Sequence, residues 1–118
     1  MKSKFRKYLF PLCALLTFIT VLPALGAPGD TPDDPIFIYD AADLDSVRNN
    51  MSAHYKLGDN IDLTDYLAFP GAGFLKWGNM GWLPIGDNSI RFTGSFDGDG
   101  YKITGLFIFH VIGQNLRL

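Results

Sequence analysis

Glutamate is missing from this 118-residue chain, and cysteine occurs only once. Without glutamate the chain cannot form the His-Glu-x-x-His helix of zinc peptidases. The single cysteine, Cys13, lies in an apolar run near the N-terminus, so no disulfide can form within the chain. A Gly-x-Ser-x-Gly nucleophile motif is also absent, and His54 and His110 are remote in sequence. We therefore expect no catalytic residues, no metal-binding residues, no cofactor and no enzymatic activity.

Positive charge is scarce beyond the N-terminus. Residues 1–10 hold four of the ten basic residues and no acidic residue. The remaining six basic residues stand against twelve acidic residues, all of them aspartate, which leaves a net charge near −6. An acidic surface repels phosphate backbones, so we expect no nucleic-acid partner.

Residues 1–26 have the three parts of a secretory signal peptide: a basic start, an uncharged apolar run over residues 9–25, and small residues around Gly26. We expect cleavage after Gly26, and a secreted or cell-surface location. A membrane anchor is the alternative. The run has 17 residues and is interrupted by Pro11 and Pro23, whereas a membrane-spanning helix needs about 20. No stable membrane span is therefore expected after cleavage.

The rest of the chain divides into a linker and one folded part. Residues 27–35 contain three prolines, one glycine and three aspartates, a composition typical of a linker. Residues 36–118 form the folded part. They begin with a β-rich run followed by a short helix from Ala41 to Asn50, for which Asp40 has the position and chemistry of an N-cap. Leu44, Val47 and Met51 lie on one face of that helix.

Strand patterns follow this helix. Tyr55, Leu57, Ile61 and Leu63 occupy odd positions, so one face can be buried throughout. Residues 92–96 and 101–108 also alternate. Residues 66–81 are rich in glycine and aromatic residues and lack a clear period, so we expect an irregular stretch. With no helix of crossover length between the strands, the pattern favours a mainly β fold.

Three motifs occur in a fixed order: Tyr-x-Leu-x-x-x-Ile-Asp-Leu at 55–63, Trp-x-Pro-Ile-Gly at 82–86, and Phe-x-Gly-x-Phe-Asp-Gly-x-Gly-x-x-Ile-x-Gly-Leu at 92–106. In this order they resemble the N-terminal portion of bacterial GLUG-repeat and filamentous-haemagglutinin-like surface proteins. The resemblance covers about residues 36–108. It implies the start of a right-handed parallel β-helix (a β-solenoid) with one short N-terminal capping helix, exported to the cell surface. The repeats that name the family do not follow in this chain, so we expect an incomplete domain.

Two features suggest a ligand. The aromatic residues of the irregular stretch and its end could stack on sugar rings, which makes the candidate ligand-binding residues Tyr66, Phe74, Trp77 and Trp82. The alternative is that these side chains seal the core. The Asp97–Gly100 segment could suggest calcium, but the twelfth position of an EF-hand loop would be Ile108, so a tight turn is the better interpretation.

These features predict a non-catalytic, secreted or cell-surface structural or adhesion module, the N-terminal part of a β-solenoid adhesin. The alternative is a secreted carbohydrate-binding or polysaccharide-active β-helix protein. The expected partners are glycans or proteins of a host surface or a cell wall. Self-association through the open end of the solenoid is also expected, because the apolar tail at 107–112 would be an unpaired edge.

Overall fold

The computed structural model describes residues 26–109. The predicted signal peptide, up to residue 25, and the tail from residue 110 lie outside the described residues. The elements, in chain order, are β1 (Ile36–Ile38), α2 (Ala41–Ser46), β2 (His54–Leu57), β3 (Ile61–Asp62), α3 (Thr64–Leu67), α4 (Ala72–Trp77), β4 (Ser95–Asp97) and β5 (Ile103–Thr104). Short 3₁₀ turns extend two of the helices: Val47–Asn49 follows α2, and Gly78–Met80 follows α4.

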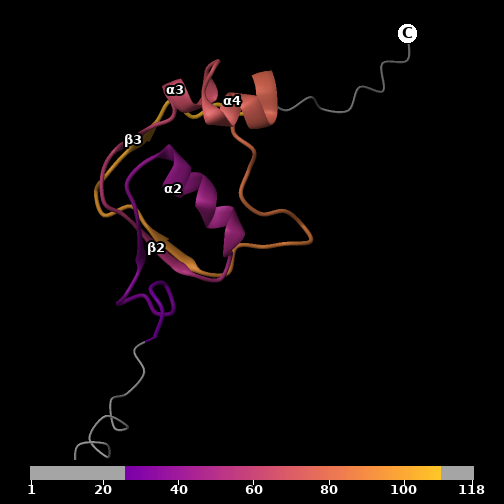
Figure 1. The fold of residues 1–118 in the computed structure, drawn as a ribbon. Helices are drawn as coiled ribbons and strands as arrows, with labels where there is room; N and C mark the ends of the chain where they lie inside the picture. The colour runs from indigo at the N-terminus through magenta and orange to yellow at the C-terminus, as the bar shows by residue number, and fades with distance from the viewer. Residues whose placement is uncertain (1–25, 110–118) are drawn as a thin grey trace, which may run out of the picture.

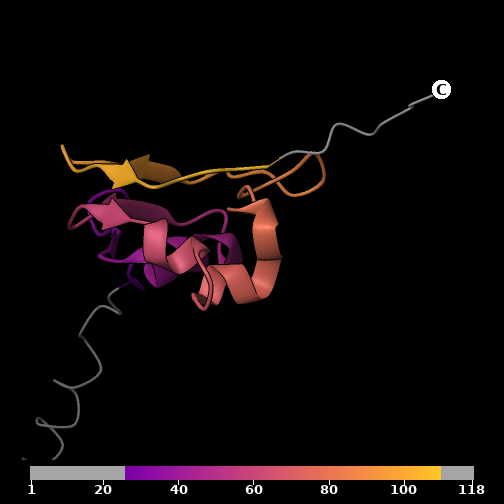
Figure 2. The same ribbon diagram turned by 90° about the horizontal axis from the view of Figure 1, so that it is seen from above.

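The strands form two small parallel sheets. One sheet has the order β1-β2-β4, and the other pairs β3 with β5. Parallel strands need long connections, and here the connection from β1 to β2 contains α2. Figure 1 shows α2 inside the outline formed by β2, β3, α3 and α4. In Figure 2 the segments that carry β4 and β5, orange to yellow, lie as a layer along one side of the rest.

The core lies between the helices α2 and α3 and the strands β1, β2 and β3. Its buried members are Ile38, Leu44, Val47, Ala53, Tyr55, Leu57, Ile61, Leu63, Leu67 and Trp82. The prediction that the apolar residues at odd positions from 55 to 63 share a buried face is confirmed, because all four are buried. The buried hydroxyl of Tyr55 donates to the carbonyl of Asn50 at 2.7 Å.

Two backbone approaches hold the layers together. Gly94 lies so close to β2 that a Cβ at this position would be 1.8 Å from the carbonyl oxygen of Ala53. Only glycine allows this approach. At the next residue of the chain, the amide of His54 donates a hydrogen bond to the carbonyl of Gly29 at 3.0 Å, which attaches the turn at 27–35 to β2.

The start of α2 is capped by the residue that the sequence predicted. The carboxylate of Asp40 accepts a hydrogen bond from the amide of Asp43 at 2.8 Å. The carboxylate of Asp43 in turn accepts from the amide of Tyr39 at 3.0 Å. These two bonds satisfy amides that the helix itself cannot pair. The predicted helix at 41–50 is confirmed as α2 with its 3₁₀ extension.

The prediction of a mainly β fold, the start of a right-handed parallel β-helix with one short capping helix, is wrong. Within residues 26–109 the strands are two to four residues long and form two separate small sheets. Helical segments contain more residues than the strands do. The described part of the chain is therefore a small α/β structure and not a solenoid.

The error lies in the stretch at 66–81, which is helical and not irregular. Its glycines do not separate strands: Gly71 precedes α4, Gly73 is buried within α4, and Gly78 ends it with φ of 60°. Glycine is common at this position after a helix because it adopts positive φ at little cost. Before α3, the carboxylate of Asp62 accepts hydrogen bonds from both the amide and the hydroxyl of Thr64.

The first testable prediction concerns the helix cap. Replacing Asp40 with alanine removes the acceptor for the amide of Asp43 and should lower the free energy of unfolding by about 1 kcal/mol. Urea unfolding followed by circular dichroism measures this loss. Asp40→Asn is the matched control, because asparagine caps helices about as well as aspartate does. Equal stability of Asp40→Ala and the unsubstituted chain would contradict the capping role.

Candidate functional site

Three of the four predicted ligand-binding aromatics lie together. The ring centroid of Tyr66, on α3, is 6.3 Å from that of Trp77 on α4 and 6.2 Å from that of Trp82. The two tryptophan rings are 5.4 Å apart, at an edge-to-face angle of 67°. This is a preferred geometry of aromatic pairs. Phe74 does not join this cluster and instead pairs edge-to-face with Phe69, at 5.6 Å.

Arg48 lies over the two tryptophans. Its guanidinium carbon is 5.1 Å from the ring centroid of Trp77 and 5.5 Å from that of Trp82. One of its Nη atoms donates a hydrogen bond to the carbonyl of Leu83 at 3.0 Å. A planar cation on aromatic faces is a stabilising arrangement. Arg48 thus covers faces of the rings that a sugar would otherwise stack on.

The polar centre of this cluster is Asp45, on α2. Its side chain is buried, with a relative exposure of 6% for the residue. Oδ1 accepts a hydrogen bond from Nε of Arg48, and Oδ2 accepts from Nζ of Lys76 and, at 3.0 Å, from the hydroxyl of Tyr66. The carboxylate therefore joins α2 to both α3 and α4. We call Asp45, Arg48, Tyr66, Lys76, Trp77 and Trp82 the Asp45 cluster.

The contacts change the ionisation of three groups. Burial alone raises the pKa of Asp45, but the hydrogen bonds from Lys76, Arg48 and Tyr66 outweigh it, so this pKa lies below its ordinary value. The hydrogen bond to Asp45 raises the pKa of Lys76. Burial, followed by the hydrogen bond to Asp45, raises the pKa of Tyr66. The cluster is therefore a carboxylate, two cations and a neutral phenol at physiological pH.

This arrangement suits a structural clamp better than a catalyst. A general base needs a pKa near the working pH and a free lone pair aimed at the substrate. Asp45 has a lowered pKa, and both of its oxygens already accept hydrogen bonds. The sequence pattern indicated the aromatic residues but not Asp45 as their centre. The available signal was the i, i+3 spacing of Asp45 and Arg48 next to the buried stripe of the helix.

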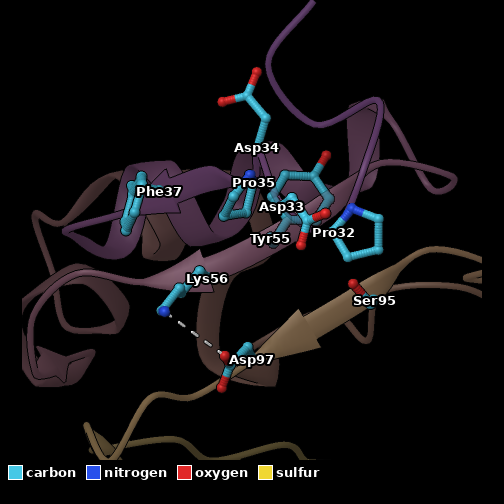
Figure 3. Close-up of a pocket in the computed structure, with 9 residues that line it drawn as sticks. All are labelled: Pro32, Asp33, Asp34, Pro35, Phe37, Tyr55, Lys56, Ser95 and Asp97. Atoms are coloured by element: carbon cyan, nitrogen blue, oxygen red, sulfur yellow. Dashed lines mark ion pairs between the residues drawn. The ribbon is translucent and has the colours of Figure 1, made fainter.

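A second feature is an open pocket of about 440 Å³ beside the three-stranded sheet. Its lining includes the ring of Phe37 and the carboxylates of Asp33, Asp34 and Asp97. Figure 3 shows the side chains of Lys56 and Asp97 pointing toward one another, 3.9 Å apart, whereas the carboxylate of Asp34 points away from them. Such an exposed ion pair contributes little to stability.

One Ser–His pair borders this pocket. Nδ1 of His54, on β2, lies 2.7 Å from Oγ of Ser95 on β4. A nucleophilic serine needs a base that is itself oriented by a third group. Within residues 26–109, the structure gives no hydrogen bond from this imidazole to a carboxylate. We therefore interpret the pair as a hydrogen bond between neighbouring strands.

The turn at 97–100 is confirmed. The carboxylate of Asp97 accepts from the amide of Asp99 at 2.9 Å, and Asp99 has φ of 46°. In the described part of the chain, no three His, Cys, Asp or Glu residues are grouped so that they could hold a metal ion. The same residues contain no helix that is long and apolar enough to span a membrane.

Two known proteins are similar to this chain. One is a protein of Evansella cellulosilytica described as a Gly-rich membrane protein, 43% identical over 97 residues; the match covers 72% of this chain and 10% of the relative. The other is halomucin of Haloquadratum walsbyi, 36% identical over 93 residues, with 75% of this chain and 1% of the relative covered. The chain thus spans a tenth or less of each relative. No protein-family model and no solved structure matches it.

The comparisons do not test the resemblance to GLUG-repeat and filamentous-haemagglutinin-like proteins, because neither relative's name refers to such repeats. That resemblance stays a prediction. The sugar-binding role of Tyr66, Phe74, Trp77 and Trp82 also stays a prediction. For three of these residues, a sugar would have to compete with the contacts inside the Asp45 cluster.

The second testable prediction concerns Asp45. Asp45→Asn removes the charge that Arg48 and Lys76 share, and should lower the free energy of unfolding by about 2 kcal/mol at pH 7, since hydrogen bonds between charged groups contribute roughly 1.5–3 kcal/mol. Because the folded-state pKa of Asp45 is lowered, its contribution is fully present above the unfolded value near 4 and is lost as pH falls further.

Urea unfolding of both proteins between pH 7 and pH 2.5 measures this difference. The gap between them should be constant above about pH 5 and should narrow below about pH 4. Asp33→Asn, which neutralises an exposed aspartate, is the control and should leave stability unchanged. A gap that does not depend on pH would show that Asp45 acts by packing alone.

Proposed function

We propose that this protein is a non-catalytic module of the cell surface or the secreted space, with a structural or adhesive role. The observation that carries the proposal is its 43% identity, over 97 residues, with a small part of a protein named as a membrane protein. The signal-peptide pattern at 1–26 supports the same location independently. The match to halomucin is again to a small fraction of a very long chain, as expected of a module used within large proteins.

The contacts of the described residues favour a structural role. The buried carboxylate of Asp45 lies at the centre of the Asp45 cluster, and its hydrogen bonds join three helices. Their ionisation suits permanent ion pairs and not proton transfer. A module of this kind would present its outer surfaces to partners, either glycans or proteins, while the cluster keeps the helices in place.

A second candidate function is carbohydrate binding, and the pocket beside β1 favours it. The ring of Phe37 is exposed by 45%, and that of Tyr39, exposed by 57%, stacks beside it at 6.0 Å. Exposed rings next to carboxylates are the combination that holds a sugar by stacking and by hydrogen bonds to its hydroxyls. Here Asp33 and Asp97 supply the carboxylates.

The third testable prediction concerns export. The full chain is fused to the N-terminus of alkaline phosphatase, whose activity requires disulfides that form only outside the cytoplasm. In a bacterial host we expect active phosphatase in the periplasm, in the medium or on the cell surface. The same fusion lacking residues 1–26 is the control and should be inactive. Equal activity of the two fusions, or none from either, would contradict the proposed location.

The fourth testable prediction separates adhesion to sugars from a purely structural role. If the pocket binds carbohydrate, the exported chain is retained on an immobilised polysaccharide, and Phe37→Ala weakens retention several-fold without lowering the melting temperature. Phe69→Ala is the matched control, because that ring is exposed but remote from the pocket. In the same assay, Trp77→Ala tests the sugar-binding role that the sequence predicts for the aromatic residues of the 66–82 stretch. Failure of the chain to bind any acidic or neutral polysaccharide would favour the structural role alone.

A further inference from the structure

The two sheets end on the same layer of the molecule. β4 is the last strand of the order β1-β2-β4, and β5 is the last strand of the other sheet. Within residues 26–109 no further strand pairs with either of them. In Figure 2 this layer forms one whole side of the described structure. We call residues 88–109 the terminal layer. Its strands present unpaired backbone groups at their outer edges, which makes them available for pairing.

The apolar rows of the core continue into this layer and are uncovered there. Phe96 is in register with Tyr55, yet Tyr55 is 3% exposed and Phe96 is 39% exposed. Ile103 is in register with Ile61, yet Ile61 is 2% exposed and Ile103 is 38% exposed. The two residues of each pair are aligned on neighbouring strands of one sheet. Their exposures differ because the terminal layer covers Tyr55 and Ile61, whereas no further layer of the described residues covers Phe96 and Ile103.

The exposed apolar side chains are concentrated here. Besides Phe96 and Ile103, the terminal layer exposes Ile90, Tyr101, Leu106, Phe107, Ile108 and Phe109. Their exposed fractions lie between 38% and 63%. With about 150 Å² for each whole side chain, the lower end of the range for aromatic residues, they together offer roughly 600 Å² of surface. A standard interface buries about 800 Å² per partner, so this layer with its polar rim is large enough for a stable pair.

Charge favours a second copy of the same chain at this surface. Residues 26–87 contain ten aspartates and three basic residues, so most of the surface repels another copy. The terminal layer contains two aspartates, Asp97 and Asp99, and two basic residues, Arg91 and Lys102, so its net charge is zero. Two copies therefore meet with the least repulsion through this layer.

We propose that two copies of this chain associate through their terminal layers, with the open edges of β4 and β5 at the interface. A two-fold axis gives a closed dimer in which the same patch is used twice. When β4 pairs antiparallel with its counterpart about Phe96, the hydroxyl of Ser95 lies opposite a carboxylate, that of Asp97 of the partner subunit. Along β4, no pair of like charges is then directly opposed. This inference does not depend on the proposed location or on sugar binding.

The fifth testable prediction is the mass of the exported chain in solution. Multi-angle light scattering over a range of concentrations should give twice the chain mass, with a decrease toward the mass of one chain on dilution. Because apolar burial drives the contact, added salt should not dissociate the dimer. Ile103→Lys and Phe96→Lys each place a charge in the interface and should give a monomer.

The controls keep folding and association apart. Leu75→Lys makes the same kind of change at an exposed position of α4, outside the terminal layer, and should remain dimeric. Circular dichroism checks that each variant is folded, and Ile103→Lys alone is sufficient if Phe96→Lys unfolds. A monomer at all concentrations would overturn the proposal, since it would mean that another molecule, or nothing, covers the layer. Masses that grow without limit, or a dimer insensitive to both lysine variants, would overturn it as well.

Discussion

Asp45 brings a negative charge into the interior of a small protein, and a buried charge is costly unless it is paired and hydrogen-bonded. Here Arg48, Lys76 and Tyr66 all donate to its two oxygens. The donors come from the same helix, from α4 and from α3, so satisfying one carboxylate brings three helices together. The tryptophans then pack against Arg48, which extends the cluster to the segment after α4. One buried carboxylate thus links all three helices by hydrogen bonds.

This constraint also limits what the site can do. The aromatic residues that could bind a sugar are partly occupied by the ion cluster, and the carboxylate that could act as a base is held ionised by its partners. Chemistry on a ligand would have to take place elsewhere. The described structure offers two other surfaces: the pocket beside Phe37, which has carboxylates and an exposed ring, and the terminal layer, which is apolar and neutral. Both are suited to binding.

The two relatives share with this chain only a small part of their own length. Each is many times longer than the segment that it shares with this chain. A segment used within such proteins needs a core that keeps its shape and surfaces that meet neighbours. In this chain, two buried residues of the core are in register with two exposed residues of the terminal layer: Tyr55 with Phe96, and Ile61 with Ile103. The proposed contact surface is thus a continuation of the core.

The features that could be predicted from the sequence are local ones. The cap at Asp40, the buried stripe of Leu44 and Val47, and the buried odd positions from 55 to 63 depend on residues a few positions apart, and periodicity records such spacing. The helix at 72–77 was missed because the glycines at its two ends look like glycines that separate strands. The helix at 64–67 was missed because its four residues, about one turn, are too few to show a helical period. The Asp45 cluster was missed for a different reason. Asp45 and Lys76 are 31 residues apart, and β2 pairs with β4 over 41 residues. No local pattern encodes which distant residues meet; only the folded chain decides it, when burial of a charge makes its partners necessary.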